Sequence, residues 1–177
     1  MSTSGQTKND LPFRQIPDYP EIYTPATVIA RMIDGLGFRY YWATEGLKEK
    51  DLEYRPSDEA RTSEETIDHI LSLCLAASNT IKETSTKVDI SAMGFDEKRR
   101  LTLETLKKAS DLLHQNPDMD LESKIFKTGK LEFPFWNIIN GQLSDALWHV
   151  GQVVSFRRSS GNPINPNVSV FSGVLVE

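Results

Sequence analysis

The chain has little of what several common classes of protein require. It contains one cysteine, Cys74, which excludes an internal disulfide and a cysteine-rich zinc site. Its 20 Lys and Arg residues are interspersed among 25 Asp and Glu residues, for a net charge of −5, and no basic block is present to neutralise nucleic-acid phosphates. No apolar run approaches the roughly 18 residues that cross a bilayer, and the first ten residues lack the apolar stretch of a signal peptide. We therefore expect a cytoplasmic protein without a nucleic-acid or membrane partner.

The composition that remains is that of an ordinary globular protein. Hydrophobic residues make up 38% and charged residues 25% of 177 residues, which is enough for one domain with a core of its own. Prolines in the first 25 residues predict a flexible or extended lead-in over 1–24, followed by a single domain over 25–177. Asn-Pro pairs at 162–163 and 165–166 force turns, so we expect the last 15 or so residues, about 163–177, to form a non-helical tail.

Four amphipathic segments predict an all-α four-helix bundle. Thr24-Pro25 is typical of a helix start and predicts a helix over 25–47. Thr62 and Glu65 form a capping box that opens a second helix, ending near residue 82. Asp96 is the predicted cap of a third helix that ends near His114, and a fourth helix is expected over 134–158. The alternation around Thr128-Gly129 indicates a short β-hairpin before this last helix.

The fourth helix carries Asp145 and His149, which are four residues apart and therefore share one helical face. His69 lies in the middle of the second helix. If the two helices pack together, His69, Asp145 and His149 would form a three-ligand metal site with an open side. The predicted core stripe of the fourth helix is Ile139, Leu143, Leu147, Val150 and Val154. The candidate ligands lie on a second stripe with Ile138, Gln142, Gln152 and Phe156. Because this second stripe mixes apolar with ionisable groups, it indicates a half-buried cleft.

Simpler explanations exist for each of these groups. Asp145 and His149 could be an exposed ion pair, and His69 a hydrogen-bonded histidine beside the core. His114 is explained by the helix dipole, because it stands in a last turn, and it is left out of the site. Cys74 falls on a buried stripe, where it is a small apolar filler rather than a nucleophile.

Several motifs together resemble the DinB/YfiT-like superfamily of four-helix bacterial proteins. They are residues 30–39 of the opening helix, residues 46–56 before the second helix, Thr66-Ile-Asp-His69-Ile, and Asp145-Ala-Leu-Trp-His149-Val-Gly-Gln-Val, and the likeness extends over roughly residues 25–165. The resemblance implies three histidines that hold a divalent metal between the second and fourth helices. His69 and His149 match two of these positions, and Asp145 stands where the third histidine is expected. Nickel or zinc is the implied metal, with manganese or iron as alternatives because a carboxylate is one of the ligands, or no metal if the replacement has abolished the site.

The resemblance also implies an activity on a small molecule. Family members include thiol S-transferases that use low-molecular-weight thiols and metal-dependent hydrolases, and a bound cation can generate either nucleophile at neutral pH. No general base can be named from the sequence. Gln152 is a candidate to orient a ligand or touch substrate. Trp148 and Phe156 could wall the pocket, although packing in the core is the alternative for both. A homodimer is the default oligomer.

The competing hypothesis is a metal-free helical bundle that dimerises or binds a partner or an apolar ligand. Its surface would be formed by the tail over 168–171 and by aromatic residues of the opening helix, namely Phe38, Tyr40, Tyr41 and Trp42. Packing of these side chains within the subunit is the alternative.

Overall fold

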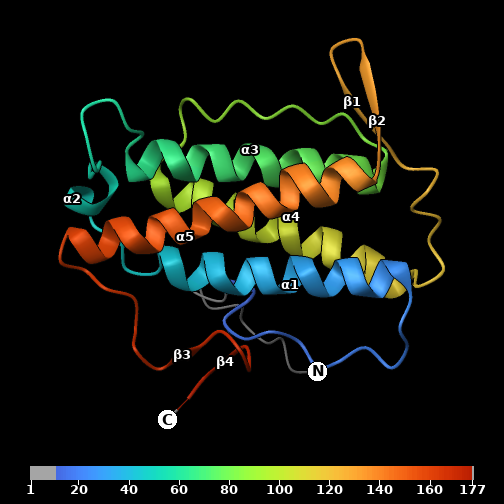
Figure 1. Ribbon diagram of the computed structural model, residues 1–177, viewed down its shortest axis with the longest axis horizontal. Helices are drawn as coiled ribbons and strands as arrows, with labels where there is room; N and C mark the ends of the chain where they lie inside the picture. The colour runs from blue at the N-terminus through green and yellow to red at the C-terminus, as the bar shows by residue number, and fades with distance from the viewer. Residues whose placement is uncertain (1–10, 177) are drawn as a thin grey trace, which may run out of the picture.

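The computed structural model describes residues 11–176 and is mainly helical. Four long helices pack together as a bundle (Figure 1). They are α1 (Pro25–Thr44), α3 (Ser63–Lys82), α4 (Phe95–Gln115) and α5 (Ser144–Ser159). A short helix, α2 (Glu49–Leu52), lies in the connection before α3, which the sequence presented only as polar. The predicted fold class is confirmed. Among residues 11–176, none of the helices combines the length and apolar character that crossing a bilayer requires.

The predicted helix starts depend on side-chain caps. The Thr24 hydroxyl accepts from the Thr27 amide at 3.3 Å, and the Thr62 hydroxyl accepts from the Glu65 amide at 3.1 Å. Glu65 completes the capping box by accepting from the Thr62 amide at 2.7 Å. The prediction for α4 was wrong by two residues, because Gly94 rather than Asp96 is its N-cap. The prediction that α1 reaches residue 47 was also wrong, since it ends at Thr44 and Gly46 turns the chain with φ of +68°.

The core lies between the four long helices and contains all four aromatic residues of α1. Phe38 and Tyr40 are fully buried, and Tyr41 and Trp42 are nearly so. These four side chains are therefore not available to form the binding surface that the metal-free hypothesis requires. Arg157 is also buried, and its guanidinium donates to the carbonyls of Trp42 and Ala43 at 3.0 Å each. This arginine ties the end of α5 to the end of α1.

Two small antiparallel hairpins complete the fold. The predicted hairpin is present as β1 (Ile125–Thr128) and β2 (Leu131–Pro134), with Gly129 in the turn at φ +59°. The tail was expected to be non-helical and forms β3 (Val168–Ser169) and β4 (Val174–Leu175). It meets the N-terminal segment, where the Ile16 amide donates to the Gly173 carbonyl at 2.8 Å.

A π-helical turn, η1 (Ile138–Leu143), runs directly into α5. The buried apolar residues of this continuous segment are Ile138, Leu143, Ala146, Val150 and Val153. Ile138 and Leu143 are five residues apart, a spacing that an α-helix would place on different faces and that a wider π-turn keeps on one face. The core stripe predicted from α-helical periodicity was therefore partly wrong. Leu147 is 44% exposed, and Ile139 and Val154 are only partly buried.

Candidate metal centre

The candidate centre lies between α3 and α5, which run side by side in opposite directions (Figure 1). This packing brings His69 of α3 to the pair on α5. His69 Nε2 lies 3.4 Å from Asp145 Oδ2, and His149 Nε2 lies 3.3 Å from Asp145 Oδ1. The two imidazole rings meet edge to face with centroids 4.7 Å apart. The structure thus brings together all three residues that the sequence singled out.

The spacing of the three side chains suits a common cation. One donor atom from each residue can be chosen so that all three lie within 4.8 Å of one another. Ligands bound at 2.0–2.2 Å around a tetrahedral metal are roughly 3.4 Å apart. The two His–Asp distances are close to this value, although each ends on a different oxygen of Asp145. His69, Asp145 and His149 therefore form a group that could hold a metal ion, and their role as ligands stays a prediction.

Gln152 determines which nitrogen of His149 faces the centre. The Gln152 Oε1 atom lies 2.7 Å from His149 Nδ1, and an amide oxygen can only accept, so Nδ1 carries the proton. In the neutral imidazole the lone pair of His149 is then on Nε2, the atom beside Asp145. Ligand histidines in metalloproteins are commonly oriented by such a hydrogen bond to the other ring nitrogen.

The centre is open to solvent on one side. The side-chain exposure is 31% for His69, 39% for Asp145 and 14% for His149. Both α5 residues directly precede a buried residue, Ala146 and Val150 respectively. They therefore lie along the edge of the buried face of α5 and are half-buried. A small molecule could reach the group without any rearrangement of the helices.

The aromatic residues proposed to wall a pocket differ from one another. Trp148 is 72% exposed, which excludes the alternative that it packs in the core. It projects from α5 next to His149 in sequence. Phe156 is half-buried and packs on Tyr54 with ring centroids 5.8 Å apart.

His114, left out of the site, has a partner that the sequence did not reveal. Its Nε2 lies 3.1 Å from Oδ2 of Asp34, a carboxylate that is fully buried in α1. The Ser110 hydroxyl donates to the other oxygen of Asp34. This cluster joins α1 to α4 and contributes nothing to the metal centre. In the sequence, Asp34 lies among apolar residues of a predicted core helix. A carboxylate buried there needs a partner, because burying an unpaired charge is costly, and this was the one sign of the pairing in the sequence.

Cys74 is buried as predicted, and burial raises the pKa of its thiol to about 12. A thiolate is the form that attacks electrophiles and binds metals. A thiol that stays protonated at neutral pH does neither, so Cys74 is not a nucleophile of the site.

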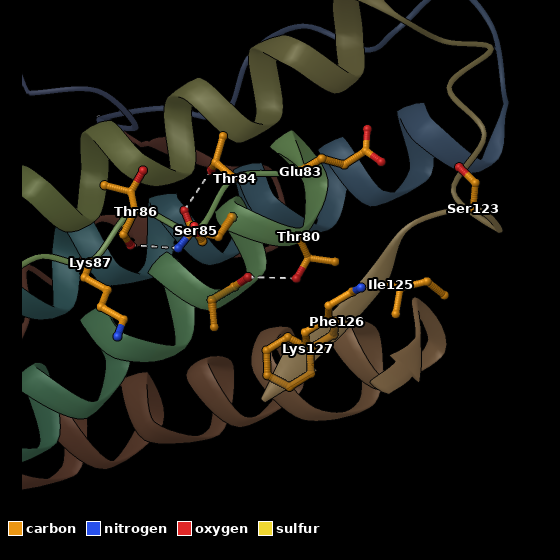
Figure 2. Close-up of a pocket in the computed structure, with 12 residues that line it drawn as sticks. Thr80, Glu83, Thr84, Ser85, Thr86, Lys87, Ser123, Ile125, Phe126 and Lys127 are labelled. Carbon is orange, nitrogen blue, oxygen red and sulfur yellow. Dashed lines mark hydrogen bonds between the residues drawn. The ribbon is translucent and has the colours of Figure 1, made fainter. Parts of the chain in front are cut away.

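A separate cavity of about 600 Å³ lies where the end of α3 and the loop after it face β1 (Figure 2). Most of its lining residues carry a hydroxyl, amide or charged group, among them Asn79, Thr80, Thr84 and Ser123, and Ala76, Ile125 and Phe126 supply apolar surface. Asn79 braces the loop by donating to the Thr86 carbonyl at 2.9 Å. None of the three candidate ligands lines this cavity. The candidate centre lies apart from it, between α3 and α5, and its three residues are half-buried.

No family model matches the chain, and no curated protein matches it either.

Proposed function

We propose that this protein is a metal-dependent enzyme that binds one divalent transition-metal ion through His69, Asp145 and His149. The observation that carries the proposal is the convergence of two imidazole nitrogens and one carboxylate oxygen from two helices. Two histidines and one carboxylate are a ligand set that zinc, nickel, manganese and iron all accept. Nickel or zinc is the metal that the resemblance to DinB-like proteins favours.

The open side of the centre supports chemistry on a small molecule. A bound divalent ion with free coordination positions lowers the pKa of a coordinated water or thiol and so supplies a nucleophile at neutral pH. The chain's own contribution is to fix the ligands. Asp145 stands between the two histidines, and Gln152 holds His149 with Nε2 inward. We infer a thiol S-transferase that uses a low-molecular-weight thiol, or a hydrolase, as the reaction class.

The binding step is tested by metal content and by thermal stability. A ligand that binds only the folded state adds about 2.7 kcal/mol at a concentration of 100 times its Kd. For a chain of this size that corresponds to a rise in Tm of roughly 5–11 °C. We expect Ni²⁺ or Zn²⁺ to raise the Tm by such an amount and EDTA to reverse it.

Matched histidine variants show whether the effect belongs to the site. His149→Ala is expected to lose the metal and the Tm response. His114→Ala removes a histidine that pairs with Asp34, so it should lower the basal Tm and leave the metal response intact. Equal metal content in the native protein and in His149→Ala would refute the proposed centre.

The second candidate function is a metal-free bundle that acts by self-association. It is favoured by a groove of about 220 Å³ between α1 and α5, beside which Val28, Met32 and Leu147 are each more than 40% exposed. A two-fold dimer would place this groove against its own copy. Sedimentation of the native protein and of Leu147→Glu tests it, and a monomeric native protein would exclude it.

A further inference from the structure

The cavity where the end of α3 and the following loop face β1 has the size of a small-molecule site (Figure 2). Its volume of about 600 Å³ falls in the range of roughly 300–1,000 Å³ that such sites occupy. Most of its lining residues are exposed or half-buried, so a molecule can enter from solvent. An ordinary ligand pocket is mostly apolar. Here three lining residues are apolar, Ala76, Ile125 and Phe126, and the others carry a hydroxyl, an amide or a charge.

The loop that forms one wall of the cavity is held to the end of α3 by Asn79 (Figure 2). The Thr84 amide donates to the Asn79 backbone carbonyl at 2.9 Å, and the Thr84 hydroxyl donates to the Asn79 side-chain oxygen at 3.0 Å. The Asn79 side-chain amide in turn donates to the Thr86 carbonyl at 2.9 Å. This wall is therefore formed before a ligand arrives, which lowers the entropic cost of binding.

Glu83 joins the same loop to the segment before β1. It follows α3 in the left-handed conformation, with φ of 53°, where glycine is the usual residue and a longer side chain is strained. Its carboxylate pairs with the Lys124 ammonium at 2.6 Å, and Lys124 directly precedes β1. The loop and β1 are thus tied together beside the cavity, which a glycine in place of Glu83 could not do.

The charged side chains around the cavity leave one positive charge without a counter-ion. Glu83 pairs with Lys124, and Lys127 pairs with Glu132 at 2.8 Å. Lys87 also lines the cavity, and it forms no ion pair with a carboxylate of residues 11–176. An ammonium donates its strongest hydrogen bonds to anionic oxygens. The ligand group that lies beside Lys87 is therefore expected to be an anion.

The uncharged lining groups favour a ligand that carries hydroxyls. The side chains of Thr80, Ser85 and Thr86 each present a hydroxyl at the cavity. A hydroxyl both donates and accepts hydrogen bonds, so it pairs best with ligand groups that have the same dual capacity. Phe126 adds an apolar surface for the C–H groups of such a ligand, and its ring is held by stacking on Phe133 with centroids 6.3 Å apart.

We propose that this cavity binds a small polyhydroxylated anion, of the class of sugar phosphates and sugar acids. Its anionic group lies beside Lys87, and its hydroxyls bind the serine and threonine side chains of the loop and of α3. The site is separate from the candidate metal centre, none of whose residues lines the cavity, and binding there requires no metal.

The test is an NMR titration of the full-length, ¹⁵N-labelled protein in EDTA, so that any metal is removed. The probes are glucose 6-phosphate, gluconate, glucose and inorganic phosphate. We expect an anionic sugar to shift the amide signals of residues 84–87 and 125–127. Glucose lacks the anion and inorganic phosphate lacks the hydroxyls of the sugar, so each should bind about tenfold more weakly or worse. The tighter of the two anionic sugars shows whether phosphate or carboxylate is preferred.

A matched pair of lysine variants tests the location of the anion. Lys87→Gln removes the unpaired charge at similar length, and we expect about tenfold weaker binding of the anionic sugar. Lys87 is exposed, so this variant is expected to fold. Lys130→Gln removes an exposed lysine of the turn between β1 and β2, outside the lining of the cavity, and should leave the affinity unchanged.

Three results would overturn the proposal. The first is that neither anionic sugar shifts the amide signals of residues 84–87 and 125–127 at millimolar concentration. The second is that inorganic phosphate binds as tightly as glucose 6-phosphate, because the hydroxyls would then take no part. The third is an equal loss of affinity in Lys87→Gln and Lys130→Gln, which would make the effect one of net charge alone.

Discussion

Replacing Gly37 by alanine is expected to expel the Phe13 side chain from the core. Phe13 is only 4% exposed and lies over α1 at Gly37. A Cβ atom at residue 37 would stand 2.5–2.7 Å from three carbons of the phenyl ring, so the whole ring has to leave. Loss of a buried Phe side chain costs about 3–5 kcal/mol. Alanine regains about 1 kcal/mol of helix propensity over glycine, which leaves a net destabilisation of about 2–4 kcal/mol.

The prediction becomes sharper in a double-mutant cycle. Phe13→Ala alone should cost about 3–5 kcal/mol. In that background Gly37→Ala meets no ring and should stabilise the protein by about 1 kcal/mol. Urea unfolding followed by circular dichroism measures all four free energies, with equal m-values as the condition for comparing them. Additive effects of the two substitutions, or a Gly37→Ala protein more stable than the native one, would refute the proposed packing.

Four further results are expected. Burial alone would raise the pKa of Asp51, but hydrogen bonds from the Ser160 hydroxyl, the Asn162 amide and the Lys48 backbone lower it below 3.8. The free energy that Asp51 contributes to folding is thus fully present above pH 3.8 and is lost as the pH falls through the lower pKa of the folded protein. The free energy of unfolding of Asp51→Asn should therefore fall less steeply with pH in that range than that of the native protein. Cys74 should resist a disulfide-forming thiol reagent in the native protein and react at once in 6 M guanidinium, because burial raises its pKa to about 12; fast reaction in native buffer would contradict this. Arg157→Met should lower the free energy of unfolding by about 2–4 kcal/mol, because it leaves two carbonyls at the end of α1 without their donor; a urea midpoint equal to that of the native protein would rule out this role. Asp145→His supplies the three-histidine set that the family resemblance implies, and calorimetry should show tighter binding of Ni²⁺ or Zn²⁺ than in the native protein, whereas weaker binding would mean that the carboxylate suits this centre better.

The parts of the fold set by local chemistry were predictable from the sequence. The capping box at Thr62 and Glu65 depends on residues three apart, so it can be recognised without knowledge of the tertiary structure. The hairpin turn at Gly129 has the same local character. The face shared by Asp145 and His149 follows from helix geometry alone, and the structure retains it.

Features that depend on distant packing were not predictable in the same way. The π-turn interrupts the 3.6-residue period of the α-helix. The core stripe predicted from Ile139 through Leu147 therefore includes residues that do not face the core. The resemblance placed His69 beside α5, but no local pattern did, because that proximity depends on how α3 and α5 pack. The pairing of His114 with Asp34 joins residues 80 apart in the sequence, and only the packing of α1 on α4 reveals it.

The separation of His69 from Asp145 by 76 residues has a consequence for biosynthesis. At 5–20 residues per second, the ribosome delivers the second half of the centre roughly 4–15 s after the first. During that interval His69 is the one ligand of the candidate centre that has been made, and one imidazole holds transition metals weakly. Acquisition of an ion would then be one of the last events in maturation, after α5 has emerged and docked, and the choice of metal would be made by the finished fold rather than by the growing chain.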